Sequence, residues 1–278
     1  MQAAELDALV DHFLPVLVTA GDFARTIQGG VHSAGQKSGP NAWAEAVTDA
    51  DLAIQGFFEV ATLARDSRLG FFGEESAQSS IARYFKADAA TVVYLDPVNG
   101  TFLYQSQQDN WDIILSIAHA GRLLASISYM PVSGQFFLAV EHRGALTGHR
   151  DTPSLTGMRP LRTQSGSRVC LTYQAPDVVQ AIGNQYQAFD LVADYRQGKT
   201  VDNLNALFTG RLDAFACHDG DLLDWGAMGY IVSHAGGVCS KLDGTPLQGL
   251  QNFSGEGQSD MLVSASPAIH REILSLLN

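Results

Sequence analysis

Apolar residues near the amino terminus recur every three or four positions, which is the period of an amphipathic helix. The pattern predicts a helix over residues 4–28 with these apolar positions: Leu6, Leu9, Val10, Phe13, Leu14, Leu17 and Val18. The next segment, residues 29–44, is rich in Gly, Ser and Pro and contains Lys37, so we expect a loop there. Thr48 is predicted to cap a second helix that runs to about residue 65.

Short runs rich in β-branched and aromatic residues follow, separated by Gly, Asn, Asp or Pro. They predict strands at residues 69–72, 92–95, 112–118, 123–129 and 135–140. Strands joined in this way favour a largely antiparallel sheet. Residues 110–112 are interpreted as the start of a core strand in which Trp111 packs against its neighbours.

The pattern changes in the second half of the chain, where strands alternate with helices. Strands are predicted at residues 169–172 and 214–217, and helices at residues 201–209 and 224–234. This alternation predicts a second α/β layer. A segment rich in Pro, Gly, Ser and Thr, residues 144–166, is the expected boundary. We therefore expect an α+β part at residues 1–150 and an α/β part at residues 151–278, both forming one compact unit.

Composition and charge exclude several classes of partner. The net charge of −12 argues against a nucleic-acid partner, because phosphate backbones are bound by clustered Lys and Arg. No apolar run reaches the roughly 18 residues of a membrane span, and acids stand where a secretory signal carries basic residues, so we expect a cytoplasmic protein. Cys170, Cys217 and Cys239 lie far apart and suggest neither a disulfide framework nor a Cys-based metal site.

Acidic residues at the ends of predicted strands and the starts of predicted helices carry the candidate chemistry. Asp51 lies in the first turn of the second helix, Glu74 follows the strand at residues 69–72, and Asp96 follows the strand at residues 92–95. Asp224 opens a later helix. One such Asp alone is more often a turn or cap residue than a ligand. Together they form the oxygen-rich set that suits Mg²⁺.

Two such ions can activate a water, screen a phosphate and stabilise the leaving oxygen during in-line transfer. Backbone N–H groups of Gly100 and Thr101 could add donors to that phosphate.

The ordered set of segments resembles the inositol monophosphatase family, whose members carry a Lys-containing loop followed by VTxxD, GEE, DPxDGT, WDxxA and AGG motifs. The matching segments here are Lys37, residues 47–51, 73–75, 96–101, 224–227 and 235–237. Nearly the whole chain follows this order, and Asp96-Pro97 followed by Gly100-Thr101 is the most specific piece.

The resemblance implies an αβαβα sandwich of the inositol monophosphatase and sugar phosphatase type, Mg²⁺ dependence with two or three ions, and a homodimer. It implies that Glu74, Asp96 and the carbonyl of Val98 hold the first ion, and that Asp96, Asn99 and Asp224 hold the second. It also assigns Asp51 and Thr101, with Glu74, to the attacking water. Gly100, Thr101 and Lys37 would bind the substrate phosphate.

The chain departs from the family pattern at Asn99, where the DPxDGT motif has its second acid. The amide lacks the formal charge of a carboxylate, although its oxygen still coordinates hard cations, so we expect weaker metal binding. Three origins of Asn99 are consistent with the sequence: a natural amide ligand, an engineered substitution that traps substrate, and an Asn-Gly pair partly converted to acid by deamidation.

Two further departures concern the carboxyl-terminal half. Leu223 stands where the family has Trp, with Trp225 after Asp224, and the spacing to Gly236 keeps Asp224 aligned with the family acid. Inositol-preferring relatives carry a Glu at the position of Cys217, so an inositol preference is not expected. As a residue at a strand end, Cys217 is interpreted as a small buried side chain in preference to a nucleophile.

Two functions from different classes follow. The first is metal-dependent hydrolysis of a small phosphomonoester, such as a sugar, polyol or nucleotide-like phosphate, by metal-activated water. The alternative is a catalytically impaired phosphatase-like protein that binds a phosphorylated ligand without efficient turnover. A nucleotide-binding module is set aside, because the chain has neither a P-loop nor a dinucleotide-binding Gly motif.

Overall fold

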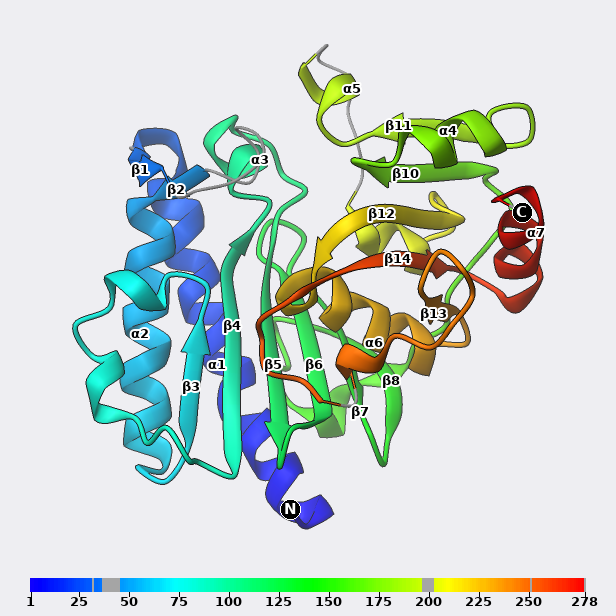
Figure 1. The fold of residues 1–278 in the computed structure, drawn as a ribbon. Helices are drawn as coiled ribbons and strands as arrows, with labels where there is room; N and C mark the ends of the chain where they lie inside the picture. The colour runs from blue at the N-terminus through cyan, green and yellow to red at the C-terminus, as the bar shows by residue number, and fades with distance from the viewer. Residues whose placement is uncertain (32, 37–45, 197–202, 251, 278) are drawn as a thin grey trace. The chain divides into compact units, whose positions relative to one another are not determined.

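The computed structural model of the chain describes residues 1–31, 33–36, 46–196, 203–250 and 252–277 (Figure 1). These residues form two compact units, Met1–Arg159 and Pro160–Asn278. A seven-stranded sheet dominates the first unit and a five-stranded sheet the second, each with its own helices. The chain is therefore a mixed α/β protein with helices and sheets in layers, as the family resemblance implies.

Two long helices open the first unit, close to the bounds predicted from apolar spacing. They are α1, Ala3–Ile27, and α2, Asp49–Arg65. The Thr48 hydroxyl accepts from the backbone N–H of Asp51 at 3.4 Å, and the Thr48 N–H donates to the Asp51 carboxylate at 2.8 Å. This capping box satisfies donors that the start of a helix otherwise leaves unpaired. The predicted N-cap is confirmed.

The sheet of the first unit has the strand order β3-β4-β5-β6-β7-β8-β9. Its strands are β3 Gly70–Gly73, β4 Thr91–Asn99, β5 Asp112–His119, β6 Arg122–Met130, β7 Gln135–Val140, β8 Gly144–His149 and β9 Arg159–Pro160. β3 is parallel to β4, and each pair from β4 to β8 is antiparallel. The expected largely antiparallel sheet is confirmed.

β8 is the main element that the sequence pattern does not predict in this unit. Gly144 and Gly148 weaken its β propensity, and it lies in the expected boundary segment. It nevertheless pairs with the whole of β7, from Val140↔Gly144 to Gln135↔His149. The smaller elements of the unit are η1 Gln28–Gly30, β1 Ser33–Gln36, β2 Ala46–Thr48, η2 Ser76–Gln78, η3 Ala82–Tyr84, α3 Thr101–Gln105 and η4 Leu155–Gly157.

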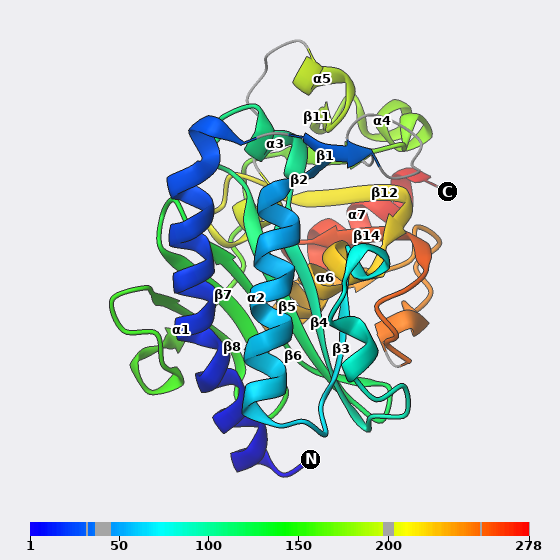
Figure 2. The same ribbon diagram turned by 90° about the vertical axis from the view of Figure 1, so that its left-hand side faces the viewer.

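The core of the first unit lies between the two helices and one face of the sheet. Figure 2 shows α1 and α2 side by side across that face. Phe13 of α1 and Phe58 of α2 stack with ring centroids 6.1 Å apart and pack on the alternating apolar side chains of the central strands. The strand residues in this core include Val93, Leu95, Ile113, Leu115, Ile117, Ala125, Ile127 and Tyr129. Trp111 is fully buried, as predicted.

The second unit contains a five-stranded sheet with the order β11-β10-β12-β14-β13. Its strands are β10 Val169–Tyr173, β11 Gln187–Asp190, β12 Ala214–Asp221, β13 Val238–Ser240 and β14 Gln258–Ser264. Helices α4, Pro176–Ile182, and α7, Pro267–Leu277, pack on one face through Val178, Ile182, Ile269 and Ile273. α6, Ala227–His234, contacts β13 and β14.

Two helix predictions in this unit need correction. The helix expected over residues 201–209 is a short 3₁₀ helix, η5, at Leu204–Phe208, with residues 201–202 outside the described residues. All five of its residues are buried, and Gly210 follows in the left-handed region at φ +74°, which ends the turn. The helix expected from residue 224 begins earlier as a π-turn, η6 Leu222–Gly226, that continues into α6.

The remaining described elements of the second unit are α5 Ala193–Arg196 and η7 Gln248–Leu250. Among the helices of the described residues, none is both long enough and apolar enough to span a bilayer.

Candidate functional site

The acids predicted at the strand ends of the first unit lie where β3 ends beside Leu95 of β4. The parallel register pairs Gly73 with Leu95, and the backbone N–H of Glu74 donates to the Leu95 carbonyl at 3.0 Å. Glu74 is exposed just beyond β3, whereas Asp96 is buried within β4. Carboxyl ends of adjacent parallel strands meet at one edge of a sheet, so the two acidic segments are neighbours.

A β-bulge in β4 brings Asp96 and Asn99 to the same face of the sheet. Asp96 pairs with Ile114 of β5, and Asn99 pairs with Asp112, so three steps along β4 oppose two along β5. Residues two apart on β5 share a face, and cross-strand partners also share a face. Without the bulge, residues three apart would point to opposite faces.

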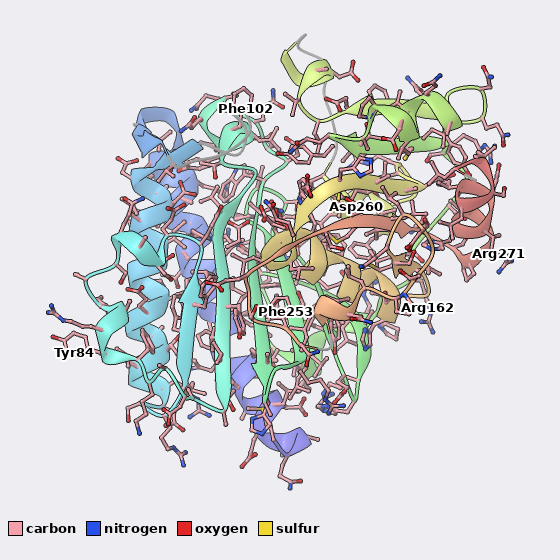
Figure 3. The ribbon with its side chains drawn as sticks, viewed as in Figure 1. Tyr84, Phe102, Arg162, Phe253, Asp260 and Arg271 are labelled. Carbon is pink, nitrogen blue, oxygen red and sulfur yellow. The ribbon has the colours of Figure 1, made fainter. Side chains whose placement is uncertain are left out.

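The turn after the bulge is held by short contacts within the motif itself. The backbone N–H of Val98 donates to Asp96 Oδ1 at 3.1 Å, and the Val98 carbonyl accepts from Thr101 Oγ1 at 3.0 Å. Gly100 adopts φ +85°, a conformation that glycine takes without strain. The chain then enters α3, which Phe102 marks in Figure 3.

Asp51 lies fully buried in the first turn of α2 and is held from two directions. Its Oδ2 accepts from the Thr48 backbone N–H at 2.8 Å and from Thr48 Oγ1 at 2.5 Å. Thr101 Oγ1 lies 3.3 Å from its Oδ1. The helix cap thus places one carboxylate oxygen against the Asp96–Thr101 segment.

Burial raises the pKa of Asp51 to about 7. Hydrogen bonds from Thr48 oppose that increase, and the nearby charges of Glu74 and Glu75 add to it. A divalent cation beside these carboxylates would offset the repulsion among them. The chemistry of the donors, which are carboxylate, carbonyl and amide oxygens, fits a hard ion such as Mg²⁺.

Sequence reasoning missed a second set of polar residues on α2. Gln55 and Glu59 follow Asp51 at intervals of four residues and therefore lie on the same helix face. Gln55 Oε1 accepts from the Glu75 N–H at 2.8 Å, and Glu59 Oε2 accepts from Ser79 Oγ at 2.8 Å. The sequence does contain a signal for this set: polar residues recur every four positions on a helix whose apolar residues Ile54 and Phe58 are buried.

Asp112 was also missed as a site neighbour. It is fully buried at the start of β5, and its Oδ1 accepts from Asn99 Nδ2 at 2.9 Å. The available signal was a single acid at the head of the apolar strand at residues 113–115.

Two predicted site residues lie outside the described part of the first unit. Lys37 lies outside the described residues. Asp224 belongs to the second unit, in the π-turn η6, where its Oδ1 accepts from the Trp225 N–H at 2.6 Å. Within the described ranges, no three His, Cys, Asp or Glu side chains are placed to hold a metal ion together. The ligand set therefore stays a prediction.

Cys217 is fully buried in β12, and burial raises the pKa of its thiol. Its interpretation as a small buried side chain is confirmed, since a nucleophilic thiol needs a lowered pKa and access to substrate. Trp225 packs in the same core, with its ring centroid 4.9 Å from that of Phe215.

The layered fold and the acidic strand-end segments define an α/β protein of the phosphatase type. The sequence profile of the inositol monophosphatase family matches residues 17–278. This chain belongs to the inositol monophosphatase family.

Individual relatives agree with this assignment. The inositol-1-monophosphatase ImpA of Mycolicibacterium smegmatis is 24% identical over 239 residues, which are 83% of this chain and 79% of ImpA. The solved structure of a Thermotoga maritima IMPase covers 98% of this chain and 97% of its own, with a TM-score of 0.73 and 19% identity. An IMPase/NADP phosphatase solved with NADP and Ca²⁺ covers 100% and 97%, with a TM-score of 0.71 and 17% identity. The predicted inositol monophosphatase fold is confirmed.

Proposed function

We propose that this protein hydrolyses a small phosphomonoester in a Mg²⁺-dependent reaction with water as the attacking group. Membership of a phosphatase family supports the reaction class. The observation that carries the proposal is the placement of the buried Asp51 carboxylate against Thr101, in the turn that also holds Asp96 and the Val98 carbonyl.

The proposed ligands of the first ion are Glu74, Asp96 and the Val98 carbonyl, and those of the second are Asp96, Asn99 and Asp224. Bound Mg²⁺ would supply Lewis acidity toward water and phosphate. Oxygen donors suit that ion, and the nearby charges of Glu74 and Glu75 add to the effect of burial in raising the pKa of Asp51.

Asp51 and Thr101 are proposed to orient the attacking water and receive its proton. Thr48 donates twice to Asp51 Oδ2, so Oδ1 is the oxygen that faces Thr101. A carboxyl pKa near 7 suits a general base at neutral pH. A P–O bond forms to the water oxygen as the ester P–O bond breaks. One water proton passes to Asp51 and the other stays on the oxygen now bound to phosphorus. The departing alcohol oxygen takes a proton from solvent, and Asp51 returns its proton to solvent.

The phosphate is proposed to bind to the backbone N–H groups of Gly100 and Thr101, with Lys37 as a further contact. Aligned backbone donors at the start of a turn bind phosphate oxygens without a side-chain charge.

The substrate is proposed to be a sugar, polyol or nucleotide-like phosphate. Cys217 occupies the position where inositol-preferring relatives carry a Glu, which argues against a preference for inositol phosphate. The bound NADP of the related IMPase/NADP phosphatase is a reason to include nucleotide phosphates among the candidates.

Phosphate release from a panel of sugar, polyol and nucleotide monophosphates tests the proposal. We expect Mg²⁺-dependent release that chelation abolishes and that Asp96→Ala reduces by at least about 100-fold. Asp88→Ala is the matched control, because Asp88 is exposed and outside the cluster. Mg²⁺-dependent binding of a phosphorylated compound without release would favour the impaired alternative. Release that persists undiminished in Asp96→Ala would contradict the proposed site.

A homodimer is proposed from the family resemblance alone. Sedimentation at several concentrations should give twice the 29.8 kDa mass of the chain. A single species at the mass of one chain would contradict it.

A further inference from the structure

The amide of Asn99 lies against a buried carboxylate from the neighbouring strand. Asn99 Nδ2 donates to Asp112 Oδ1 at 2.9 Å, and the two residues are direct cross-strand partners. Ser128 Oγ of β6 donates to the other carboxylate oxygen, Asp112 Oδ2. Asp112 and Ser128 are both fully buried, so these contacts are screened from water.

This contact determines which way the Asn99 amide faces. A carboxylate accepts hydrogen bonds and offers none, so the amide NH₂ must point toward Asp112. The flipped orientation would set the amide oxygen against a carboxylate oxygen. Among the residues that the structure describes, none donates a hydrogen bond to Asn99 Oδ1. The amide oxygen is therefore directed away from Asp112 and available to another partner.

The bulge in β4 determines on which face of the sheet the Asn99 amide oxygen lies. It places Asn99 on the same sheet face as Asp96, which is the proposed ligand shared by both ions. An amide oxygen is a good ligand for a hard cation only if it, and not the NH₂ group, faces the ion.

We propose that Asp112 is a positioning residue that fixes the Asn99 amide with its oxygen toward the cation, and that its carboxylate supplies the negative charge that Asn99 lacks. The inference rests on the proposed function, since it concerns the same ion site. The Asn99–Asp112 pair carries one formal negative charge, as a single Asp at position 99 would. In this chain the negative charge lies on Asp112 of the adjacent strand β5, and it polarises the amide of Asn99.

The arrangement predicts that an acid at position 99 is unfavourable in this chain. In Asn99→Asp the new carboxylate would stand against that of Asp112 with no proton between them. In the double variant Asn99→Asp/Asp112→Asn the groups are exchanged: the amide at position 112 donates to the carboxylate at position 99 and accepts from Ser128. The exchange restores every hydrogen bond that Asn99→Asp breaks.

The test combines thermal unfolding in chelator with calorimetric titration of Mg²⁺. We expect Asn99→Asp to have the lowest Tm in chelator and the double variant to recover most of that loss. We expect Asp112→Asn to bind Mg²⁺ about 10- to 100-fold more weakly, as is typical when the partner that orients a ligand is removed. The double variant should regain Mg²⁺ affinity to within a few-fold of the unsubstituted protein.

Ser128→Ala and Ser126→Ala form a matched pair in case Asp112→Asn does not fold. Both serines are fully buried in β6, but Ser126 contacts Ser116 and not Asp112. We expect Ser128→Ala to weaken Mg²⁺ binding, whereas Ser126→Ala changes only the Tm.

The outcomes separate this inference from the function on which it rests. If the unsubstituted protein binds Mg²⁺ and both Asp112→Asn and Ser128→Ala bind it equally well, Asp112 is a structural residue only and the inference is wrong. If the unsubstituted protein binds no Mg²⁺, the proposed function fails and the inference with it.

Discussion

Thr101 places a single hydroxyl between two acceptors, Asp51 Oδ1 at 3.3 Å and the Val98 carbonyl at 3.0 Å. One hydroxyl proton serves only one of them at a time. In the proposed site, the hydroxyl that donates to Asp51 would accept from the attacking water at the same time, so that a water proton would enter the hydroxyl as the hydroxyl proton leaves for the carboxylate. The contact with Val98 is the alternative state, in which Thr101 would not relay a proton.

The effect of replacing Thr101 on kcat should therefore depend on whether the hydroxyl is kept and not on the size of the side chain. Thr101→Val keeps the shape but removes the donor, and we expect kcat for the best substrate to fall about 100-fold. Thr101→Ser keeps the donor and should retain most of the activity. Steady-state phosphate release measures both, and equal losses in the two variants would contradict the relay.

Asp51→Asn should reduce catalysis without disturbing the fold. The amide oxygen can still accept from Thr48, and its NH₂ can donate to Thr101, so the hydrogen bonds are kept. The proposed general base is lost, and we expect kcat to fall by about 10²- to 10⁴-fold. Full activity in this variant would show that Asp51 is not the base.

The raised pKa of Asp51 also predicts a pH dependence of stability in chelator. Between the ordinary carboxyl pKa of 3.8 and about 7, the folded state binds the proton more tightly than the unfolded state. The free energy of unfolding should therefore fall as pH rises through this window and stay reduced above it. Because each pKa unit corresponds to about 1.4 kcal/mol, the loss is on the order of a few kcal/mol.

Urea unfolding at pH 5 and pH 8 should show this fall, and Asp51→Asn should remove most of it. The variant is then more stable than the unsubstituted protein at pH 8 without metal. A pH dependence that is the same in both proteins would assign it to other groups.

Gly73→Ala should disturb the Glu74 turn through a steric conflict. A Cβ at Gly73 would lie 2.2 Å from Gln55 Oε1, and Gln55 is held in place because that oxygen accepts from the Glu75 N–H. We expect a loss of about 1–3 kcal/mol in the free energy of unfolding, with reduced activity. Gly56→Ala, in the middle of α2 with open space around it, is the control and should gain about 0.5–1 kcal/mol. Equal effects of the two substitutions would contradict the steric argument.

His218 joins two acids at the surface of the second unit. Its Nε2 lies 2.9 Å from Asp177 of α4 and its Nδ1 3.1 Å from Asp260 of β14, which is labelled in Figure 3. Burial lowers the pKa of His218, but the hydrogen bonds to both acids outweigh it and raise the pKa overall. The resulting stabilisation is present below the ordinary His pKa of 6.5 and is lost as pH rises through the higher folded value.

His218→Gln should therefore lower the Tm at pH 6 and leave it nearly unchanged at pH 9. The effect should be below about 1 kcal/mol, because the side chains are partly exposed and screened by solvent. A loss of equal size at both pH values would indicate a packing role instead.

The local signals in the sequence were sufficient to predict Thr48 as the N-cap of α2. A helix cap depends on residues three positions apart, so a single sequence contains the signal. The apolar run at residues 92–95 predicts a strand that ends at Asp96, which Pro97 fixes at the start of a turn. In the structure the bulge accommodates Pro97 and β4 continues to Asn99.

The contacts that could not be predicted from the sequence depend on strand register and on the packing of elements distant in the chain. Asp112 meets Asn99 because of how β5 is aligned with β4, and no local pattern specifies that alignment. Gln55 meets Glu75 across 20 positions of chain, through the docking of α2 beside β3. β8 forms because β7 offers a complete partner, which outweighs its own weak propensity.

The bulge in β4 means that the candidate site depends on the number of residues in the chain as well as on their identity. Inserting one residue between Asp96 and Asn99 would preserve the core and every acidic side chain, but beside a single bulge it would turn Asn99 to the opposite face. Substitution scans, which preserve chain length, cannot reveal this requirement. In this part of the molecule, an insertion is a different kind of change from any substitution, because it alters which face of the sheet the following side chains point to.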